Sequence, residues 1–320
     1  MTLPKLPEAD FIEEYRTIGP AAMAKKYGMN ERSIKRRRRR LEDRDDNEII
    51  SPNARYSREA NGSGRINVDL PDGTILVGGD GHYWPGPPAG AHMAFCQVAE
   101  RIKPDIVVYN GDAFDGAAIS RWPPINWSDQ PSVAEELLVC QKRLGEIQDS
   151  AGNAALYWTL GNHDARFEAK IAATLPQLEK VAGTALHDHF DREWTSCFTV
   201  AVNGDTFIKH RIAGGVHAVY NNVLKTGVNI ITNHLHSPKV IPWTDYRGTR
   251  YGVDTGCLSD PYHPAFAYAE DNPRNWIPGF AVLTFRAGKL MPPELCLQID
   301  PGVFIFRNES WSPVDQWKYD

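Results

Sequence analysis

Residues 155–164, ALYWTLGNHD, decide the fold of this chain. The first six residues are mostly apolar and include two aromatic side chains, which predicts a buried β-strand. Gly161 ends the strand directly before three polar residues, Asn162, His163 and Asp164. Because ligands of open α/β sheets bind outside the carboxyl ends of the strands, we expect these side chains to lie at a functional edge.

Four other apolar runs are followed by similar polar residues. They are residues 74–77, 106–109, 206–209 and 228–231. The residues that follow them are Asp80 and His82, Asp112 and Asp115, His210, and His234 and His236. Helical segments at 90–102 and 132–148 alternate with the strands, as an α/β fold requires. Carboxylate, amide and imidazole groups delivered to one edge predict a metal centre without thiolate ligands.

These motifs together resemble the signature of the calcineurin-like metallophosphoesterase superfamily over about residues 74–260. The second motif, Gly111-Asp112-x-Phe114-Asp115, is similar to that of Mre11/SbcD-type nucleases. Phosphoprotein phosphatases of this superfamily have Arg and Glu where this chain has Gly116 and Asp164. Two positions depart from the superfamily pattern, because Asn233 and Arg211 stand where Gly is usual.

The resemblance implies a four-layer α/β/β/α sandwich with two divalent ions, Mn²⁺ being favoured and Fe, Zn²⁺ or Ni²⁺ being alternatives. It implies that one ion is held by Asp80, His82 and His236, the other by Asn162, His210 and His234, and that Asp112 bridges both. It also implies hydrolysis of phosphate esters by in-line attack of a hydroxide shared by the two ions. His217 is the alternative to His210. His210 is favoured because it directly follows the predicted strand at residues 206–209.

Two further residues have roles under the same resemblance. His163, paired with Asp115, is expected to act as general acid or charge stabiliser rather than as a ligand. The position of Arg166, just beyond the third motif, makes it either a contact for the substrate phosphate or a solvated helix residue. Residues 280–285, 295–299 and 303–307 are predicted strands that we expect to finish the second sheet.

The N-terminal region differs from the rest of the chain in its charge. The net charge is −5, yet residues 21–41 carry nine Lys or Arg residues against one acid, Glu31. Helical patterns at 8–18, 21–27 and 31–41, broken at Gly19 and Gly28, resemble phage and bacterial helix-turn-helix domains. We therefore expect a DNA-binding head at residues 1–42, a polar linker at 43–64 and the esterase domain at 65–320. The expected DNA contacts are Lys35, Arg36, Arg37, Arg39 and Arg40.

The sequence also limits the location and function of the protein. No apolar run approaches the ~20 residues of a membrane-spanning helix, and five scattered cysteines indicate a reduced, cytoplasmic protein without disulfides. A DNA-directed phosphodiesterase or nuclease is the favoured function. A phosphomonoesterase or small-molecule phosphodiesterase with a localising head, and a non-enzymatic DNA-binding regulator, are the alternatives. The oligomeric state stays open.

Overall fold

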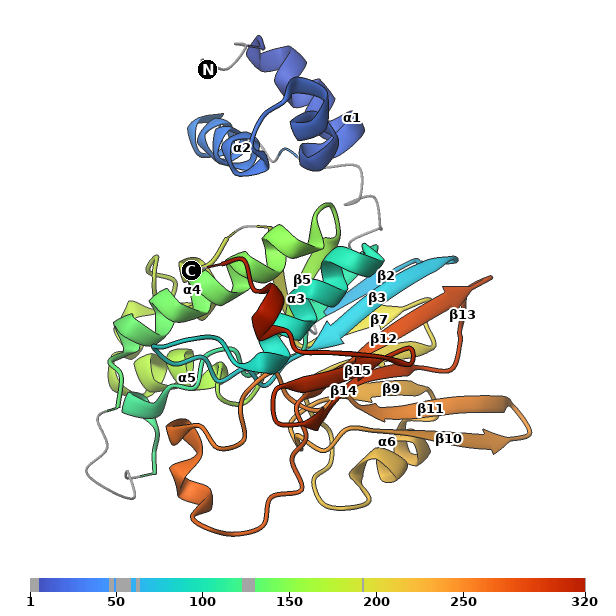
Figure 1. The fold of residues 1–320 in the computed structure, drawn as a ribbon. Helices are drawn as coiled ribbons and strands as arrows, with labels where there is room; N and C mark the ends of the chain where they lie inside the picture. The colour runs from blue at the N-terminus through green and yellow to red at the C-terminus, as the bar shows by residue number, and fades with distance from the viewer. Residues whose placement is uncertain are drawn as a thin grey trace.

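Two β-sheets lie face to face in the computed structural model, which describes residues 6–45, 49, 59–61, 64–122, 130–191 and 193–319 (Figure 1). The first sheet has the order β16-β15-β14-β12-β3-β4-β5-β6, with β13 paired to β12. Its strands are β3 (Gly73–Gly78), β4 (Ile106–Tyr109), β5 (Ala155–Thr159), β6 (Trp194–Cys197), β12 (Gly279–Arg286), β13 (Lys289–Leu290), β14 (Glu294–Asp300), β15 (Val303–Phe306) and β16 (Glu309–Trp311). Strands β3 to β6 are parallel to one another.

The second sheet has the order β1-β2-β7-β8-β9-β11-β10. Its strands are β1 (Glu59–Asn61), β2 (Arg65–Val68), β7 (Thr199–Val202), β8 (Thr206–Ile208), β9 (Asn229–Thr232), β10 (Lys239–Asp245) and β11 (Gly248–Asp254). The five strands predicted before the polar motifs therefore belong to both sheets, three to the first and two to the second.

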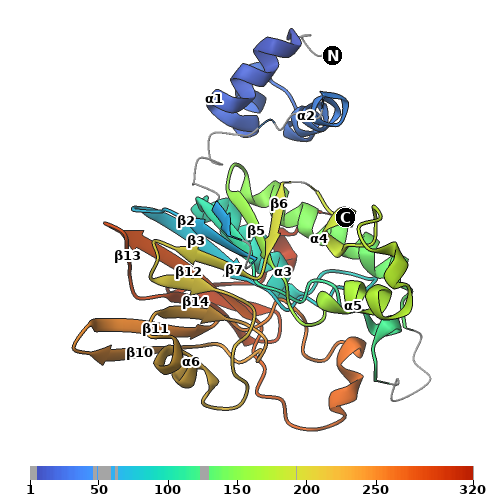
Figure 2. The ribbon, with the colours of Figure 1, turned by 180° about the vertical axis from the view of Figure 1, so that it is seen from behind.

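Helices cover the outer faces of the two sheets, which gives the four layers expected of the sandwich (Figures 1 and 2). Helices α3 (Gly90–Ile102) and α4 (Val133–Ala151) pack on the first sheet, and α6 (Ala218–Thr226) packs on β9, β10 and β11. A capping box between Ser132 and Glu135 fixes the start of α4. Helix α5 (Ala165–Thr174) directly follows the third motif.

The alternation of side chains along β4 separates two cores. Val107 and Tyr109 point to the layer of α3 and α4, whereas Ile106 and Val108 point to the second sheet. All four side chains are fully buried, as the continuous apolar run of a central parallel strand predicts.

The prediction for the C-terminal strands was wrong in one respect. Strands β12, β14 and β15 form close to the predicted ranges, but they extend the first sheet instead of finishing the second. Strand β12 pairs antiparallel with β3, Ala281 lying opposite Val77. The parallel strands β4 and β5 follow one another on the same side of β3. The opposite edge of β3 is therefore free to pair with β12.

The head contains α1 (Glu8–Tyr27) and α2 (Glu31–Asp45). Gly19, with φ 76° and ψ 172°, interrupts α1 where the sequence predicts a break, and Gly28 ends it at φ 62°. Helix α2 runs beyond the predicted end because no Gly or Pro occurs before Pro52. The predicted linker is thus shorter at both ends, since 43–45 are helical and β1 pairs with β2. Residues 46–48, 50–58, 62 and 63 of that linker lie outside the described residues.

The structure bears on the predicted absence of disulfides and of membrane-spanning helices. All five cysteines are free thiols in the structure, and their side chains are buried, which the sequence analysis did not predict. Among the helices described, none combines the length and the apolar character needed to cross a bilayer.

Candidate metal centre

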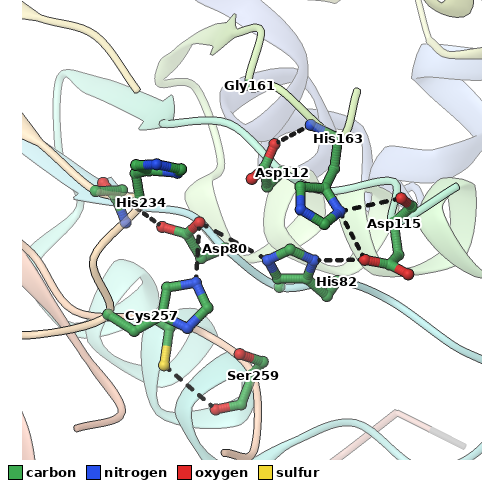
Figure 3. A network of polar contacts seen from close by, with 12 residues as sticks. Asp80, His82, Asp112, Asp115, Gly161, His163, His234, Cys257 and Ser259 are labelled. Carbon is green, nitrogen blue, oxygen red and sulfur yellow. Dashed lines mark hydrogen bonds and ion pairs between the residues drawn. The ribbon is translucent and has the colours of Figure 1, made fainter. Parts of the chain in front are cut away.

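The predicted ligands converge where the carboxyl ends of strands from both sheets meet (Figure 3). One cluster contains Asp80, His82 and His236, and the other contains Asp112, His210 and His234. Within each cluster, one ligand atom per residue lies within 4.8 Å of the others. Asp80 also joins the two clusters, because its Oδ2 accepts a hydrogen bond from the His234 backbone N–H at 2.8 Å.

The hydrogen bonding of the predicted ligands is incomplete, as expected of side chains that bind cations. Five of the seven predicted ligands have a buried polar atom without a hydrogen-bond partner within the described part of the chain. These atoms are Asp80 Oδ1, His82 Nε2, Asn162 Oδ1, His210 Nε2 and His236 Nδ1. Three of these atoms make ion contacts inside the site, because Asp80 Oδ1 lies 3.2 Å from His236 Nε2 and 3.8 Å from His82 Nε2, and His210 Nε2 lies 3.1 Å from Asp112 Oδ2. Buried polar groups are normally hydrogen-bonded, so this concentration of atoms without a hydrogen bond matches a site built for ions.

The backbone at the predicted ligands is strained. Asp80, His82, Asp112, His234 and His236 all have φ between 41° and 76°. Non-glycine residues rarely adopt this left-handed conformation, which costs about 1–3 kcal/mol per residue and clusters at functional sites. Each of these turns redirects the chain at a strand end, so that the side chain lies in the centre rather than along the strand.

Close packing of the loops leaves no room for side chains at two glycines. At Gly111, φ is 89°, and a Cβ atom would lie 2.3 Å from His210 Nδ1. At Gly161, a Cβ atom would lie 2.0 Å from Asp112 Oδ1. The glycines of the second and third motifs therefore allow the loops to approach the ligand side chains.

The carboxylates make the centre favourable for positive charge. Burial disfavours protonation of His82, yet its hydrogen bonds to Asp115 and Asp80 raise its pKa to about 10. Burial also disfavours protonation of His210, yet the charges of Asp112 and Asp80 raise its pKa to about 9. His234 differs, because burial and the charge of His210 lower its pKa to about 4.

A second set of contacts organises His163. Asp115 Oδ1 lies 2.8 Å from His163 Nδ1 and 2.9 Å from His82 Nδ1, so one carboxylate orients both rings (Figure 3). The Arg166 guanidinium lies 3.2 Å from His163 Nε2 and donates to the Asp115 backbone carbonyl at 2.8 Å. Since a guanidinium only donates, Nε2 accepts there and Nδ1 carries the proton directed at Asp115.

Sequence reasoning missed the role of Asp164. Its carboxylate, fully buried, accepts hydrogen bonds from the backbone N–H groups of Asp112, Ala113, Phe114 and Gly161. These contacts hold the second motif against the third. The signal was present, because Asp164 directly follows the Asn-His pair at a strand end, but nothing in the sequence gives its partners.

Asn110 and Asn233 form a second support that the sequence analysis did not assign. Asn110 Nδ2 donates to Asn233 Oδ1 at 2.8 Å, and Asn233 Nδ2 donates to the Gly256 carbonyl at 3.1 Å. Both side chains are buried. Asn233, which replaces the usual Gly of the last motif, thus ties the end of β9 to the end of β4.

His217 lies apart from the centre. It is the N-cap residue of α6 and is exposed, whereas His210 Nε2 is 3.1 Å from Asp112 Oδ2. The structure therefore brings together the predicted ligand and not its alternative.

The predicted DNA contacts on α2 are not equally accessible. The Lys35 ammonium lies 3.9 Å from Glu193 and its side chain is 4% exposed. The Arg37 guanidinium lies 4.5 Å from the Phe11 ring centre and donates to the Leu6 carbonyl at 2.5 Å. Arg36 and Arg40 are exposed. The Arg39 side chain is outside what the structure describes, and DNA binding by all five residues stays a prediction.

The match to one family of known proteins agrees with this geometry. The sequence model of the calcineurin-like phosphoesterase family matches residues 73–263, more than half of the chain. No curated protein sequence matches the chain. Among solved structures, Vps29 of Chaetomium thermophilum aligns with 10% identity and a TM-score of 0.39, covering 75% of this chain and 98% of that one. The family match spans every predicted ligand and the His163–Asp115 pair, and this chain belongs to the calcineurin-like phosphoesterase family.

Proposed function

We propose that this metal-dependent phosphoesterase is a phosphodiesterase that acts on DNA. The observation that best supports phosphoester hydrolysis is the convergence of the predicted ligand positions, several with buried atoms that make no hydrogen bond, beside an oriented histidine. The proposed ligands are Asp80, His82, Asp112, Asn162, His210, His234 and His236. When bound, two divalent ions supply an activated water and neutralise charge on the phosphate. Mn²⁺ is favoured by this oxygen and imidazole donor set, which also suits Fe, Zn²⁺ and Ni²⁺.

The residues beside the ligands complete the chemistry. Asp115 holds His163 through Nδ1, which leaves Nε2 as the atom that exchanges a proton with the substrate. Arg166 places a permanent positive charge 3.2 Å from the same atom. A phosphate oxygen that enters there replaces His163 as the acceptor for the guanidinium, so Arg166 positions the ester.

A basic head supports DNA as the substrate. Helix α2 carries Arg36 and Arg40 on its exposed surface, and clustered arginines bind the phosphate backbone. One observation favours the second candidate, a small phosphate ester with a head that only localises the enzyme. Lys35 and Arg38 of α2 contact Glu193 of the esterase domain, Arg38 at 3.2 Å.

The first test is hydrolysis of bis-p-nitrophenyl phosphate, p-nitrophenyl phosphate and a labelled DNA duplex with Mn²⁺ added. We expect Asp112→Asn to abolish hydrolysis of every substrate that the wild-type protein cleaves. Asp300→Asn, the same change at an exposed position of β14, is the control and should retain full activity. Unchanged activity of Asp112→Asn would show that the metal assignment is wrong.

The second test separates the two candidate substrates. The double variant Arg36→Ala/Arg40→Ala should weaken DNA cleavage and spare bis-p-nitrophenyl phosphate. Arg286→Ala/Lys289→Ala removes two exposed cations from β12 and β13 and serves as the control. Turnover of small esters without DNA cleavage would favour the second candidate.

A further inference from the structure

A segment rich in aromatic residues borders the metal centre. We call residues 257–278, between β11 and β12, the rim segment; it contains the short helix η5 (Pro264–Ala269) and forms the orange loop of Figure 1. Both of its ends are fixed to loops of the centre. The Leu258 N–H donates to the carbonyl of Gly79, next to Asp80, and the Ile277 N–H donates to the carbonyl of His236, each at 2.8 Å. The rim segment is therefore held in a defined position beside the predicted ligands.

The aromatic rings of the rim segment contact ligand imidazoles directly. The Trp276 ring centre lies 4.6 Å from that of His236, and the Phe266 ring centre lies 5.1 Å from that of His82. Phe266 is buried, and Tyr268 packs on it with a centre-to-centre distance of 6.2 Å. Tyr268 itself is 53% exposed. The rim segment thus has an aromatic base and two tyrosine rings that are open to solvent, since Tyr262 is 87% exposed. Of these two, Tyr268 is the ring that packs on Phe266 of the base.

Polar contacts keep this arrangement rigid and compatible with an anionic substrate. The Arg274 guanidinium lies 5.5 Å from the Trp276 ring centre and donates to the carbonyls of Phe266 and Glu270, each at 3.2 Å. The phenol of Tyr268 is neutral at physiological pH, because tyrosine ionises only near pH ~10, and it adds no negative charge beside a phosphate.

We propose that Tyr268, supported by Phe266 and Trp276, stacks on the nucleobase next to the phosphate that the centre binds. This inference rests on the proposed function and adds how the substrate is recognised. Every base presents a π face, so stacking on an aromatic ring tolerates any sequence and is strong enough to change affinity at least severalfold. The base belongs either to a DNA strand or to a free nucleotide, and both present the same face to the ring.

The test compares two ligands that differ only in the base, deoxyadenosine 5′-monophosphate and 2-deoxyribose 5-phosphate. Their dissociation constants are measured by calorimetry on the full chain with Mn²⁺ added. We expect the wild-type protein to bind the nucleotide about tenfold more tightly. Tyr268→Ala should reduce this ratio to about two or less, and Tyr268→Phe should retain it because the ring remains.

Tyr246→Ala is the matched control, since Tyr246 is a fully exposed tyrosine at the turn between β10 and β11. It should leave the ratio unchanged. Equal affinities for the two ligands, no measurable binding of the nucleotide, or an unchanged ratio in Tyr268→Ala would each overturn the inference. Because nucleotide binding and ester hydrolysis are separate measurements, a tenfold ratio in a protein that hydrolyses no ester would contradict the proposed function alone.

The source of the base is decided by a further titration. Tighter binding of a single-stranded tetradeoxyadenylate than of the mononucleotide, with the gain reduced in Tyr268→Ala, supports recognition of a strand. Equal binding of both supports recognition of a free nucleotide through the same ring.

Discussion

His163 is the residue whose proposed role depends most on its neighbours. It is not among the proposed ligands, and Asp115 and Arg166 contact both nitrogens of its ring. We predict that His163→Asn lowers kcat by about 10²–10⁴, the usual contribution of a positioned general acid–base group. Metal content, measured by mass spectrometry, should stay at the wild-type value. His187→Asn, at an exposed position, should have no effect. A loss of metal in His163→Asn would instead make His163 a ligand.

The histidines of the centre also predict how metal affinity depends on pH. The pKa values of about 10 for His82 and about 9 for His210 mean that both rings are protonated at neutral pH in the metal-free protein. A cation must displace these protons, so binding releases protons and raising the pH favours the bound form. His234, with a pKa of about 4, is already neutral and releases none.

We therefore predict that Mn²⁺ affinity rises steadily between pH 6 and pH 8, by up to about tenfold per pH unit for each proton released. Calorimetric titrations in two buffers with different ionisation enthalpies measure the affinity and the number of protons together. An affinity that is constant or falls with pH would contradict the displacement of protons from His82 and His210.

At the scale of elements, the ends of strands from two sheets have to be held together. Asn110, after β4, donates to Asn233 after β9 at 2.8 Å and to the Lys209 carbonyl after β8 at 3.3 Å. Its own backbone carbonyl lies 2.9 Å from His210 Nδ1. This buried side chain therefore joins both halves of the sandwich directly below the metal centre.

Asn110→Ala should lower the free energy of unfolding by about 1–3 kcal/mol, because the buried Asn233 amide oxygen loses its donor. Activity should fall as well, since the ends of β4 and β9 are no longer tied. Urea denaturation and ester hydrolysis measure the two effects. Asn221→Ala, exposed in α6, is the control. Full stability of Asn110→Ala would contradict the proposed support.

At the scale of the whole molecule, the head contacts the esterase domain through charged groups. Glu193 lies 3.2 Å from Arg38 and 3.9 Å from Lys35, and it accepts a hydrogen bond from the Tyr15 hydroxyl at 3.2 Å. The two basic side chains are 8% and 4% exposed. Removing the charge of a buried partner is costly, so we expect Glu193 to contribute to the position of the head.

Glu193→Gln should increase amide hydrogen exchange in α2 by about tenfold or more, because local opening becomes easier. Exchange measured by mass spectrometry on the full chain tests this. Glu179→Gln changes an exposed glutamate and should leave α2 unaffected. Equal exchange in Glu193→Gln and the wild-type protein would show that the head is held by other contacts.

The sequence by itself determined the fold class and predicted ligands that the structure brings together. Strands such as 106–109 and the helix at 90–102 agree with the structure to the residue, because buried apolar runs and helical periodicity are local properties. The order of the motifs likewise predicted the family. Gly19 and Gly28 marked the breaks in the head, since left-handed backbone favours glycine.

Only the tertiary structure decided which distant residues meet. Strand β12 returns along β3, and Asn110 bonds to Asn233. Asp164 accepts hydrogen bonds from the backbone N–H groups of Asp112, Ala113 and Phe114. Each of these contacts joins residues far apart in the chain. The same holds for the contact of α2 with Glu193, which buries Lys35 although its charge suggested a solvent-exposed position. The local sequence pattern indicates which chemistry a side chain can perform. The partners of that side chain depend on how the two sheets and the head pack together. No short stretch of sequence specifies that packing.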